Sequence, residues 1–238
     1  MVVVLPALAT AMSPSISGAW RSTDGHLDRV LLVVDGFWTY TIFDRSNPEF
    51  HRTFGGPYRA DGETVKGAYH FDSGDATQVG QTFSLRVRQQ NDTLELLHDD
   101  GTSESWRRIP EQSGPLTGVW RIIGRQSDDS AQLAALRPRR TLKVLTGSRF
   151  QWIAMNIETG EFSGTGGGTY TFADGKYVEN LEFFSRDNSR VGARLEFDGT
   201  VNDGRWRHQG LSSRGDPIDE TWVKLGPEEG RVRLGGTR

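Results

Sequence analysis

The four residues Gly18-Ala19-Trp20-Arg21 recur in the second half of the chain as Gly118-Val119-Trp120-Arg121, and this recurrence decides the fold. Further matches follow in the same order, and the spacing between the copies drifts only slowly, as loop insertions would produce. They are Gly56-Pro57-Tyr58 with Gly168-Thr169-Tyr170, Ala60-Asp61-Gly62 with Ala173-Asp174-Gly175, Val79-Gly80 with Val191-Gly192, Asn91-Asp92 with Asn202-Asp203, and Glu104-Ser105-Trp106 with Glu220-Thr221-Trp222. A preserved order of matches indicates an internal duplication.

Each copy has the pattern of antiparallel β-structure. Alternating runs such as Phe83–Arg88 and Ala193–Phe197 have the period of two that a sheet with one buried face requires. One segment, Asp128–Leu136, predicts a helix of about two turns. Asp-Gly pairs between the runs predict hairpin turns, because both residues tolerate positive φ. These pairs are Asp35-Gly36, Asp61-Gly62, Asp100-Gly101, Asp174-Gly175, Asp198-Gly199 and Asp203-Gly204.

The predicted fold is therefore all-β, with two tandem antiparallel barrel units related by a pseudo-two-fold internal repeat. With 238 residues, the chain is long enough for two domains of about 110 residues each. We expect the units at residues 15–110 and 115–225, with a linker at Pro110–Pro115 and a flexible tail at 226–238. Trp20 and Trp120 should occupy equivalent buried places.

The N-terminus has two interpretations. Met1–Ala11 is apolar and ends in Ala9-Thr10-Ala11, like the end of a secretory signal, which would make residues 1–14 a leader and the protein secreted or periplasmic. A secretory signal usually begins with a basic residue, however, and the first basic residue of the chain is Arg21. Translation could therefore begin at Met12 instead, and the protein would then be cytoplasmic. The signal interpretation is slightly favoured. No stretch approaches the ~20 apolar residues that a membrane span requires.

Composition excludes several classes of function. The net charge of −3 provides no broad positive field, so nucleic acid is not an expected partner. The absence of cysteine excludes disulfides, Cys-ligated metals and thiol catalysis. No metal or cofactor is expected. Arginines 137, 139 and 140 are interpreted as solvated loop charges, and the segment Gly164–Gly168 as a flexible loop or hairpin tip. Four histidines lack metal-ligand spacing and are assigned to the surface: His26, His51, His70 and His98.

A Gly-x-Trp opening a unit of antiparallel strands resembles the lipocalin and wider calycin signature. A finer pattern in the second copy resembles a lipocalin-like family of uncharacterised bacterial proteins, many of them secreted or membrane-anchored. It consists of Gly168-Thr169-Tyr170, Tyr177-Val178-Glu179, Val191-Gly192, Trp206-x-His208-x-Gly210 and Glu220-Thr221-Trp222-Val223-Lys224. The resemblance covers most of residues 115–225 and, more faintly, 15–110. The first copy departs from the pattern, with Thr64 and Lys66 where the second copy has Tyr177 and Glu179.

The resemblance implies that a tryptophan closes one end of each barrel and that a basic residue from the last strand packs over it. Arg107 or Arg108 would cover Trp20, and Lys224 would cover Trp120, through cation–π contact.

Strand parity assigns an interior face to the second copy. Tyr177, Glu179 and Phe183 share a side with Leu181, and other strands contribute further inward positions. The faces together predict an aromatic pocket with a few polar groups, which is typical of a small-molecule site. The expected ligand-binding residues are Trp152, Asn156, Tyr170, Phe183 and Trp206.

Glu179 is the candidate for chemistry, because a buried carboxylate is costly unless it is paired. A partnership with His208 or Tyr177 would lower that cost and could also serve as a general acid/base pair. A purely structural hydrogen bond explains the same pattern. In the first copy, Trp38 and Tyr40 could line a pocket or fill the core, and the core is favoured.

Three functions are compatible with this pattern. The leading hypothesis is a binding protein for a small hydrophobic or amphipathic molecule, with the better-formed site in the second copy. The alternative is an isomerase, cyclase, lyase or hydratase that uses Glu179 with His208 or Tyr177. The third is an interaction module with two solid barrels. The oligomeric state is left open, a homodimer included.

Overall fold

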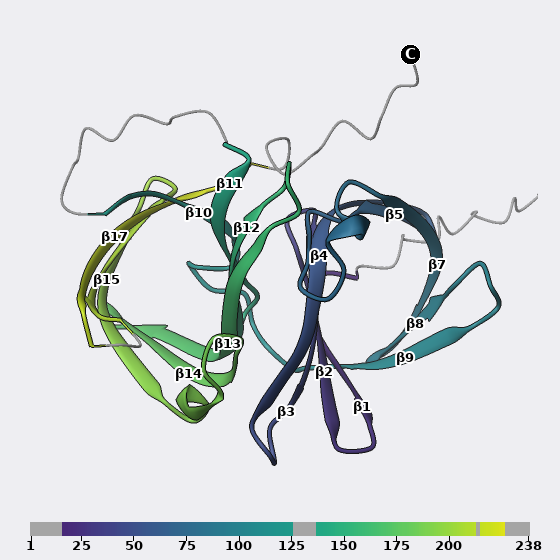
Figure 1. Ribbon diagram of the computed structural model, residues 1–238, viewed down its shortest axis with the longest axis horizontal. Helices are drawn as coiled ribbons and strands as arrows, with labels where there is room; N and C mark the ends of the chain where they lie inside the picture. The colour runs from purple at the N-terminus through teal and green to yellow at the C-terminus, as the bar shows by residue number, and fades with distance from the viewer. Residues whose placement is uncertain (1–15, 126–136, 213–214, 227–238) are drawn as a thin grey trace, which may run out of the picture.

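A computed structural model describes residues 16–125, 137–212 and 215–226. These residues form two closed barrels of eight antiparallel strands each, in tandem (Figure 1), so the predicted fold class is confirmed. The predicted leader at 1–14, the helix at Asp128–Leu136 and the tail beyond residue 226 lie outside the described residues. No described helix has the length and apolar character that crossing a membrane would require.

The first barrel closes in the order β3-β2-β1-β9-β8-β7-β5-β4, because β3 also pairs with β4. A short strand, β6, continues the line of β5 beside β4. The elements are β1 Gly18–Asp24, β2 Leu27–Val34, β3 Phe37–Asp44, β4 Glu49–Asp61, β5 Thr64–Ala68, β6 Phe71–Asp72, the 3₁₀ turn η1 Ala76–Gln78, β7 Thr82–Gln90, β8 Thr93–Leu97 and β9 Ser103–Arg108.

The second barrel runs in chain order from β10 to β17 and closes through β10 and β17. Its elements are β10 Gly118–Arg125, β11 Arg139–Leu145, β12 Arg149–Asn156, β13 Phe162–Ala173, β14 Lys176–Phe184, the 3₁₀ turn η2 Asn188–Arg190, β15 Arg194–Asn202, β16 Arg205–Leu211 and β17 Pro217–Lys224. The prediction that Arg139 and Arg140 are loop charges is wrong, because these two residues begin β11.

Five of the six predicted Asp-Gly pairs lie in turns. Asp35, Asp174 and Asp203 adopt positive φ there, as a tight hairpin requires. The prediction is wrong for Asp198-Gly199, which lies inside β15 and pairs with β16.

The prediction of a loop at Gly164–Gly168 is also wrong, because the segment lies inside β13. These glycines make room for neighbouring rings. A Cβ on Gly166 would lie 2.7 Å from both the Trp152 Nε1 and a carbon of Phe184. The lack of side chains serves close packing here and not flexibility.

The two tryptophans of the repeat occupy equivalent places. Each indole is fully buried and donates to a carbonyl four residues earlier, Trp20 to Ile16 and Trp120 to Leu116, both at 2.8 Å. The Arg108 guanidinium lies 4.0 Å from the Trp20 ring centre, as the resemblance implied.

Lys224, the cation expected over Trp120, reaches the first barrel instead. Its Nζ lies 3.4 Å from the Asp35 carboxylate. The ion pair therefore links the last strand of the second barrel to the β2–β3 turn of the first.

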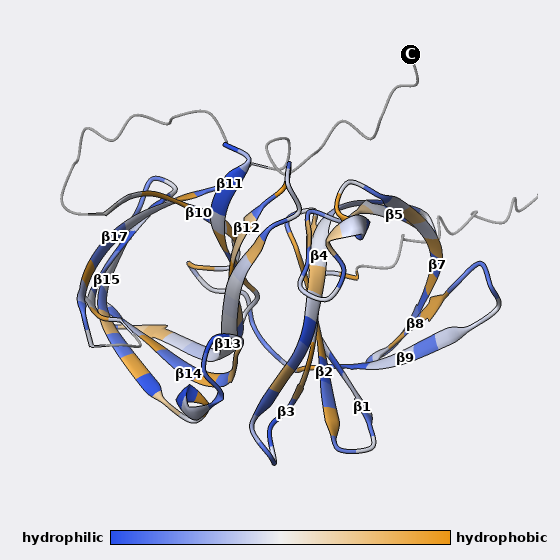
Figure 2. Ribbon diagram, viewed as in Figure 1, coloured by the Kyte–Doolittle hydropathy of each residue, from blue (hydrophilic) through white to orange (hydrophobic). Residues whose placement is uncertain are grey.

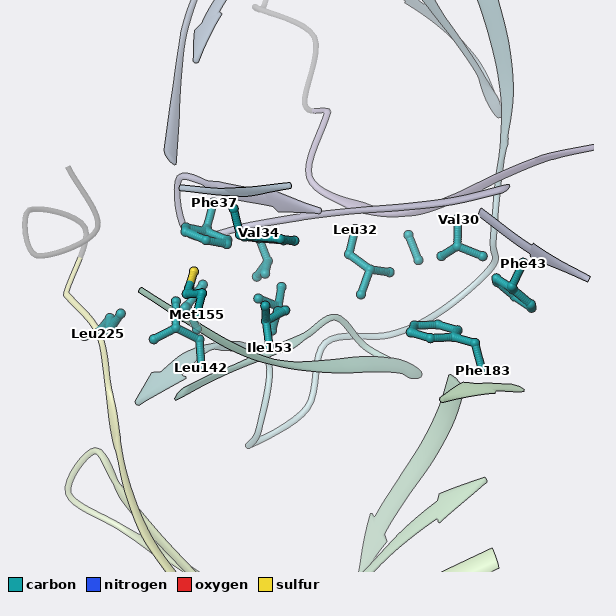
Figure 3. Packing of buried hydrophobic residues seen from close by; sticks show 14 residues of the cluster. Val30, Leu32, Val34, Phe37, Phe43, Leu142, Ile153, Met155, Phe183 and Leu225 are labelled. Atoms are coloured by element: carbon teal, nitrogen blue, oxygen red, sulfur yellow. The ribbon is translucent and has the colours of Figure 1, made fainter. Parts of the chain in front are cut away.

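The barrels meet through a continuous apolar cluster. Hydropathy alternates along many strands (Figure 2), but β2, β3, β11 and β12 are buried on both faces, one toward their own barrel and one toward the neighbour. Figure 3 shows side chains of the first barrel facing those of the second. The cluster consists of Ala19, Val30, Leu32, Val34, Phe37, Phe43, Phe71, Val119, Leu142, Val144, Ile153, Met155, Phe183 and Leu225.

Phe183 belongs to this interface, which corrects the sequence interpretation that it faces the barrel interior with Tyr177 and Glu179. The register between β13 and β14 shifts between Gly167 and Gly168, so one extra residue of β14 reverses the parity. Phe183 therefore packs against Phe43 of the first barrel, with tilted rings whose centres are 5.0 Å apart.

Candidate functional site

A cavity with a volume of about 240 Å³ lies inside the first barrel. Seven strands contribute to its wall, which is mostly aliphatic and aromatic. The lining residues are Ile16, Leu31, Val33, Trp38, Tyr40, Phe54, Tyr58, Val65, Tyr69, Phe83, Ser84, Leu85, Val87, Leu94, Leu96, His98 and Glu104.

Trp38 and Tyr40 form the centre of the aromatic wall. They stand two residues apart on β3, so both point inward. The Trp38 ring meets Phe54, Tyr69 and Phe83 edge-on, with centres 5.7, 5.6 and 5.2 Å away. These edge-to-face contacts hold the ring in a fixed orientation. Trp38 and Tyr40 belong to the buried apolar cluster of the first barrel, as the sequence preference for a core position indicated, and both also line the cavity.

One end of the cavity carries a polar group centred on Glu104. The Tyr40 hydroxyl donates to Glu104 Oε2 at 3.2 Å, and His98 Nε2 lies 3.2 Å from Oε1. Burial, followed by the Glu104 charge, raises the pKa of Tyr40 well above its ordinary value, so the phenol stays protonated and keeps donating.

The surface assignment of the histidines is wrong at His70. His70 is 6% exposed, whereas His98 lines the cavity with a side chain that stays 36% exposed. Burial, with a smaller contribution from the Arg140 charge, lowers the pKa of His70 to about 4. His26 is exposed, and His51 is about one-third exposed near Glu49. Within the described residues, no group of three or more acidic or histidine side chains is arranged to hold a metal ion.

The second barrel fills the equivalent space with its own side chains. Lys143 Nζ donates to Glu179 Oε1 at 2.7 Å, and the Tyr177 hydroxyl donates to the same oxygen at 2.9 Å. All three side chains are nearly inaccessible to solvent. The two cavities described for this protein are lined by other residues, the smaller one, of about 10 Å³, lying between the barrels.

His208 has a different partner from the one that the sequence suggested. Its Nε2 lies 2.9 Å from Glu220 Oε2 on the neighbouring strand β17. Burial is the largest cause that lowers the pKa of His208, and the charge of Lys143 acts in the same direction. The structure thus brings together Glu179 and Tyr177 and gives His208 a separate carboxylate.

The expected ligand-binding residues of the second copy lie in different surroundings. Trp206 is fully buried, and the Tyr170 hydroxyl donates to the Thr146 carbonyl at 2.7 Å. Trp152 is partly buried beside Phe184. Asn156 accepts hydrogen bonds from the backbone amides of residues 158 and 159 and so stabilises a turn.

Strand registers explain why one barrel is hollow and the other filled. Leu31 pairs with Trp20 as Lys143 pairs with Trp120, so Leu31 and Lys143 are equivalent. In the same way, Tyr58 pairs with Gly67 as Tyr170 pairs with Glu179, so Gly67 and Glu179 are equivalent. The same comparison matches Val65 with Tyr177, Leu94 with Trp206 and Leu96 with His208. This replaces the sequence alignment of Thr64 and Lys66 with Tyr177 and Glu179, which is one residue out of register.

The second barrel therefore carries larger side chains at several interior positions. Sequence analysis missed Lys143, although a lysine between Leu142 and Val144 in an apolar strand was a usable signal. Glu104 and His98 were not predicted as site residues, because the large aromatic residues of the second copy gave the stronger signal for a pocket.

No protein-family model matches the chain, and no curated protein matches it. Among solved structures, the chain is similar to the Cpx pathway activator NlpE from Escherichia coli, with 12% identity and a TM-score of 0.24 over 89% of this chain and 94% of that one. It is also similar to the Helicobacter pylori beta clamp bound to a DNA ligase peptide, with 8% identity and a TM-score of 0.15 over 89% of this chain and 58% of that one. The chain's own fold defines the class: a tandem β-barrel protein with a hollow first barrel.

Proposed function

We propose that the protein binds a small hydrophobic or amphipathic molecule inside its first barrel. The observation that carries this proposal is the cavity of about 240 Å³ with apolar and aromatic walls and a polar group at one end. Apolar walls with a few convergent polar groups are the usual composition of a ligand pocket. A hollow barrel with a buried tryptophan at one end is also what the lipocalin-like resemblance implies.

The cavity volume limits the size of the ligand. A cavity of about 150 Å³ accommodates benzene, and pockets for drug-sized ligands begin at about 300 Å³. The first-barrel cavity lies between these values. The ligand is therefore a molecule of one or two rings, or a short chain of similar volume.

We propose a supporting role for the second barrel. The Lys143 ammonium and the Tyr177 hydroxyl satisfy the Glu179 carboxylate, and aromatic rings surround this group. A fully satisfied buried network rigidifies a core. In this proposal Glu179 is structural, and a general base would instead need an open volume for a substrate.

Filling the cavity tests the binding function. Val65→Phe places a ring where the second barrel has Tyr177, so it should abolish the space without exposing a polar group. We expect calorimetric titration with 2-naphthol, a two-ring probe, to give at least ~10-fold weaker binding to this variant than to wild type, since a well-packed core resists added volume.

Leu195→Phe is the matched control. It makes a change of similar size in the second barrel, at the position equivalent to Phe83. Naphthol binding to this variant should equal that of wild type. Equal affinities for wild type and the Val65→Phe variant would place the binding site elsewhere and contradict the proposal.

A further inference from the structure

The filled barrel shows which chemical group this type of interior stabilises. Lys143 Nζ lies 4.9 Å from the Tyr177 ring centre, 5.0 Å from that of Trp206 and 5.3 Å from that of Trp222. It also donates to the Glu179 carboxylate at 2.7 Å. An ammonium inside an apolar barrel is thus stabilised by aromatic rings and one negative charge, as cation–π attraction and a charge-assisted hydrogen bond predict.

The hollow barrel keeps the aromatic surroundings but lacks a lysine among them. Leu31 occupies the position of Lys143, so no lysine enters the cavity from β2. Aromatic side chains line the cavity, and Glu104, the equivalent of Glu220, is the one acidic residue among the described residues that line it. The carboxylate therefore comes from β9 in the first barrel, whereas in the second it comes from β14.

Charges on the surrounding strands leave a negative group at Glu104. Two guanidiniums also reach the cavity wall: Arg29 interacts with the Tyr40 hydroxyl, and Arg52 lies 5.2 Å from the Phe54 ring centre. Arg29 pairs with Asp24, and Arg52 forms a two-point ion pair with Asp72, so each guanidinium has a carboxylate of its own. The partners of Glu104 are instead a phenol and an imidazole. A carboxylate has about four lone-pair sites, and these two hydrogen bonds leave room for further donors.

We infer that the ligand of the first barrel is an amphipathic primary amine, whose ring or chain packs among Trp38, Phe54 and Phe83 and whose ammonium donates to Glu104. The inference rests on the proposed function, which concerns the cavity alone, and adds the class of ligand. The ligand takes the chemical role in the first barrel that the Lys143 side chain has in the second. The cavity volume suits one ring with a chain of two or three carbons.

Three probes of the same shape test the class of ligand: 3-phenylpropylamine, 3-phenyl-1-propanol and 3-phenylpropionate. They are titrated into the full chain by calorimetry at pH 7.5 and low salt. We expect the amine to bind at least ~10-fold more tightly than the alcohol, since a hydrogen bond to a charged group is worth more than a tenfold change in affinity. The propionate should bind most weakly, because its charge repels Glu104.

The Glu104→Gln variant tests whether the Glu104 side chain causes the preference for the amine over the alcohol. The amide keeps an acceptor for Tyr40 but removes the charge, so amine affinity should fall to about that of the alcohol while alcohol affinity stays constant. Glu220→Gln is the matched control at the equivalent position of the second barrel, and it should leave the order of the probes unchanged. Thermal melts of both variants verify folding.

The outcomes distinguish the two proposals. Wild-type protein that binds the alcohol or the propionate as tightly as the amine overturns the amine assignment and leaves cavity binding intact. Retention of the full amine preference by a folded Glu104→Gln variant also overturns it. If none of the three probes binds, and 2-naphthol does not bind either, the proposed binding function fails and the amine inference fails with it.

Discussion

The two barrels have the same strand order and equivalent buried tryptophans, yet one is hollow and the other is solid. At several equivalent interior positions, the first barrel has a smaller residue and the second has a larger or charged one. These positions are Leu31 and Lys143, Val65 and Tyr177, Gly67 and Glu179, and Leu94 and Trp206. The difference teaches that interior side-chain volume decides which copy can bind a ligand, while the strand framework is common to both.

Removing the end tryptophans tests whether the barrels are equally dependent on them. Trp120→Ala and Trp20→Ala should each cost about 3–5 kcal/mol of unfolding free energy, as large-to-small changes in a core do. Urea denaturation measures the effect. Similar losses in the two variants would support equivalent roles for the two tryptophans. A change in unfolding free energy within ~0.5 kcal/mol for either variant, which is typical of surface substitutions, would contradict them.

Removing the ammonium of the filled barrel should have the next largest effect. Lys143→Met leaves Glu179 buried without its cation, and breaking a buried ion pair costs about 3 kcal/mol. Replacing both Lys143 and Glu179 by Met should recover most of that loss, because apolar replacement of a buried pair is often neutral. Denaturant midpoints of the two single variants and the double variant give the coupling.

An exposed pair provides the control for this measurement. Lys176 and Asp198 lie 2.5 Å apart on the outer wall of the same barrel, both mostly exposed. Lys176→Met should cost less than about 1 kcal/mol. A cost for Lys143→Met as small as this would mean that the ammonium does not support the filled barrel.

The pH dependence of stability provides the smallest of the three effects. His70 and Glu182 occupy equivalent positions in the two barrels. Glu182 forms ion pairs with two arginines. Burial instead lowers the pKa of His70 to about 4. Between the ordinary histidine pKa of about 6.5 and pH 4, the unfolded chain binds a proton that the folded chain does not. Stability is therefore full above about pH 6.5 and falls as the pH drops, by about 2 kcal/mol at pH 5.

His70→Phe should remove this part of the pH dependence. Urea midpoints of wild type and the variant are compared at pH 7 and pH 5, and the wild type should lose more stability between them. The lowered pKa of His208 contributes equally in both proteins and cancels in the comparison. Parallel losses in the two proteins would show that His70 does not titrate as its burial requires.

The fold could be predicted from the sequence because the repeat, the hairpin signals and the alternation all indicate the same structure. Asp35-Gly36 and Asp174-Gly175 form turns as predicted. Parity arguments succeeded for Tyr177 and Glu179 but failed for Phe183, because a register shift of one residue leaves no mark in the hydrophobic pattern.

The candidate site was harder to predict than the fold. Large aromatic residues such as Trp206 and Tyr177 indicated a pocket in the second copy, but the same bulk fills the interior there. A cavity depends on the summed volumes of residues from several strands, and it appears only when the registers are known. Trp38 and Tyr40 gave no sequence signal to separate a cavity wall from a core.

The doubly buried strands β2 and β3 have a mechanical consequence. Leu31 and Val33 line the cavity, and their neighbours Leu32 and Val34 belong to the cluster between the barrels. On this side a single layer of β-sheet therefore separates the cavity from the cluster between the barrels. We expect this wall to be the least deformable side of the cavity, since the side chains packed behind it have the low compressibility of a protein interior.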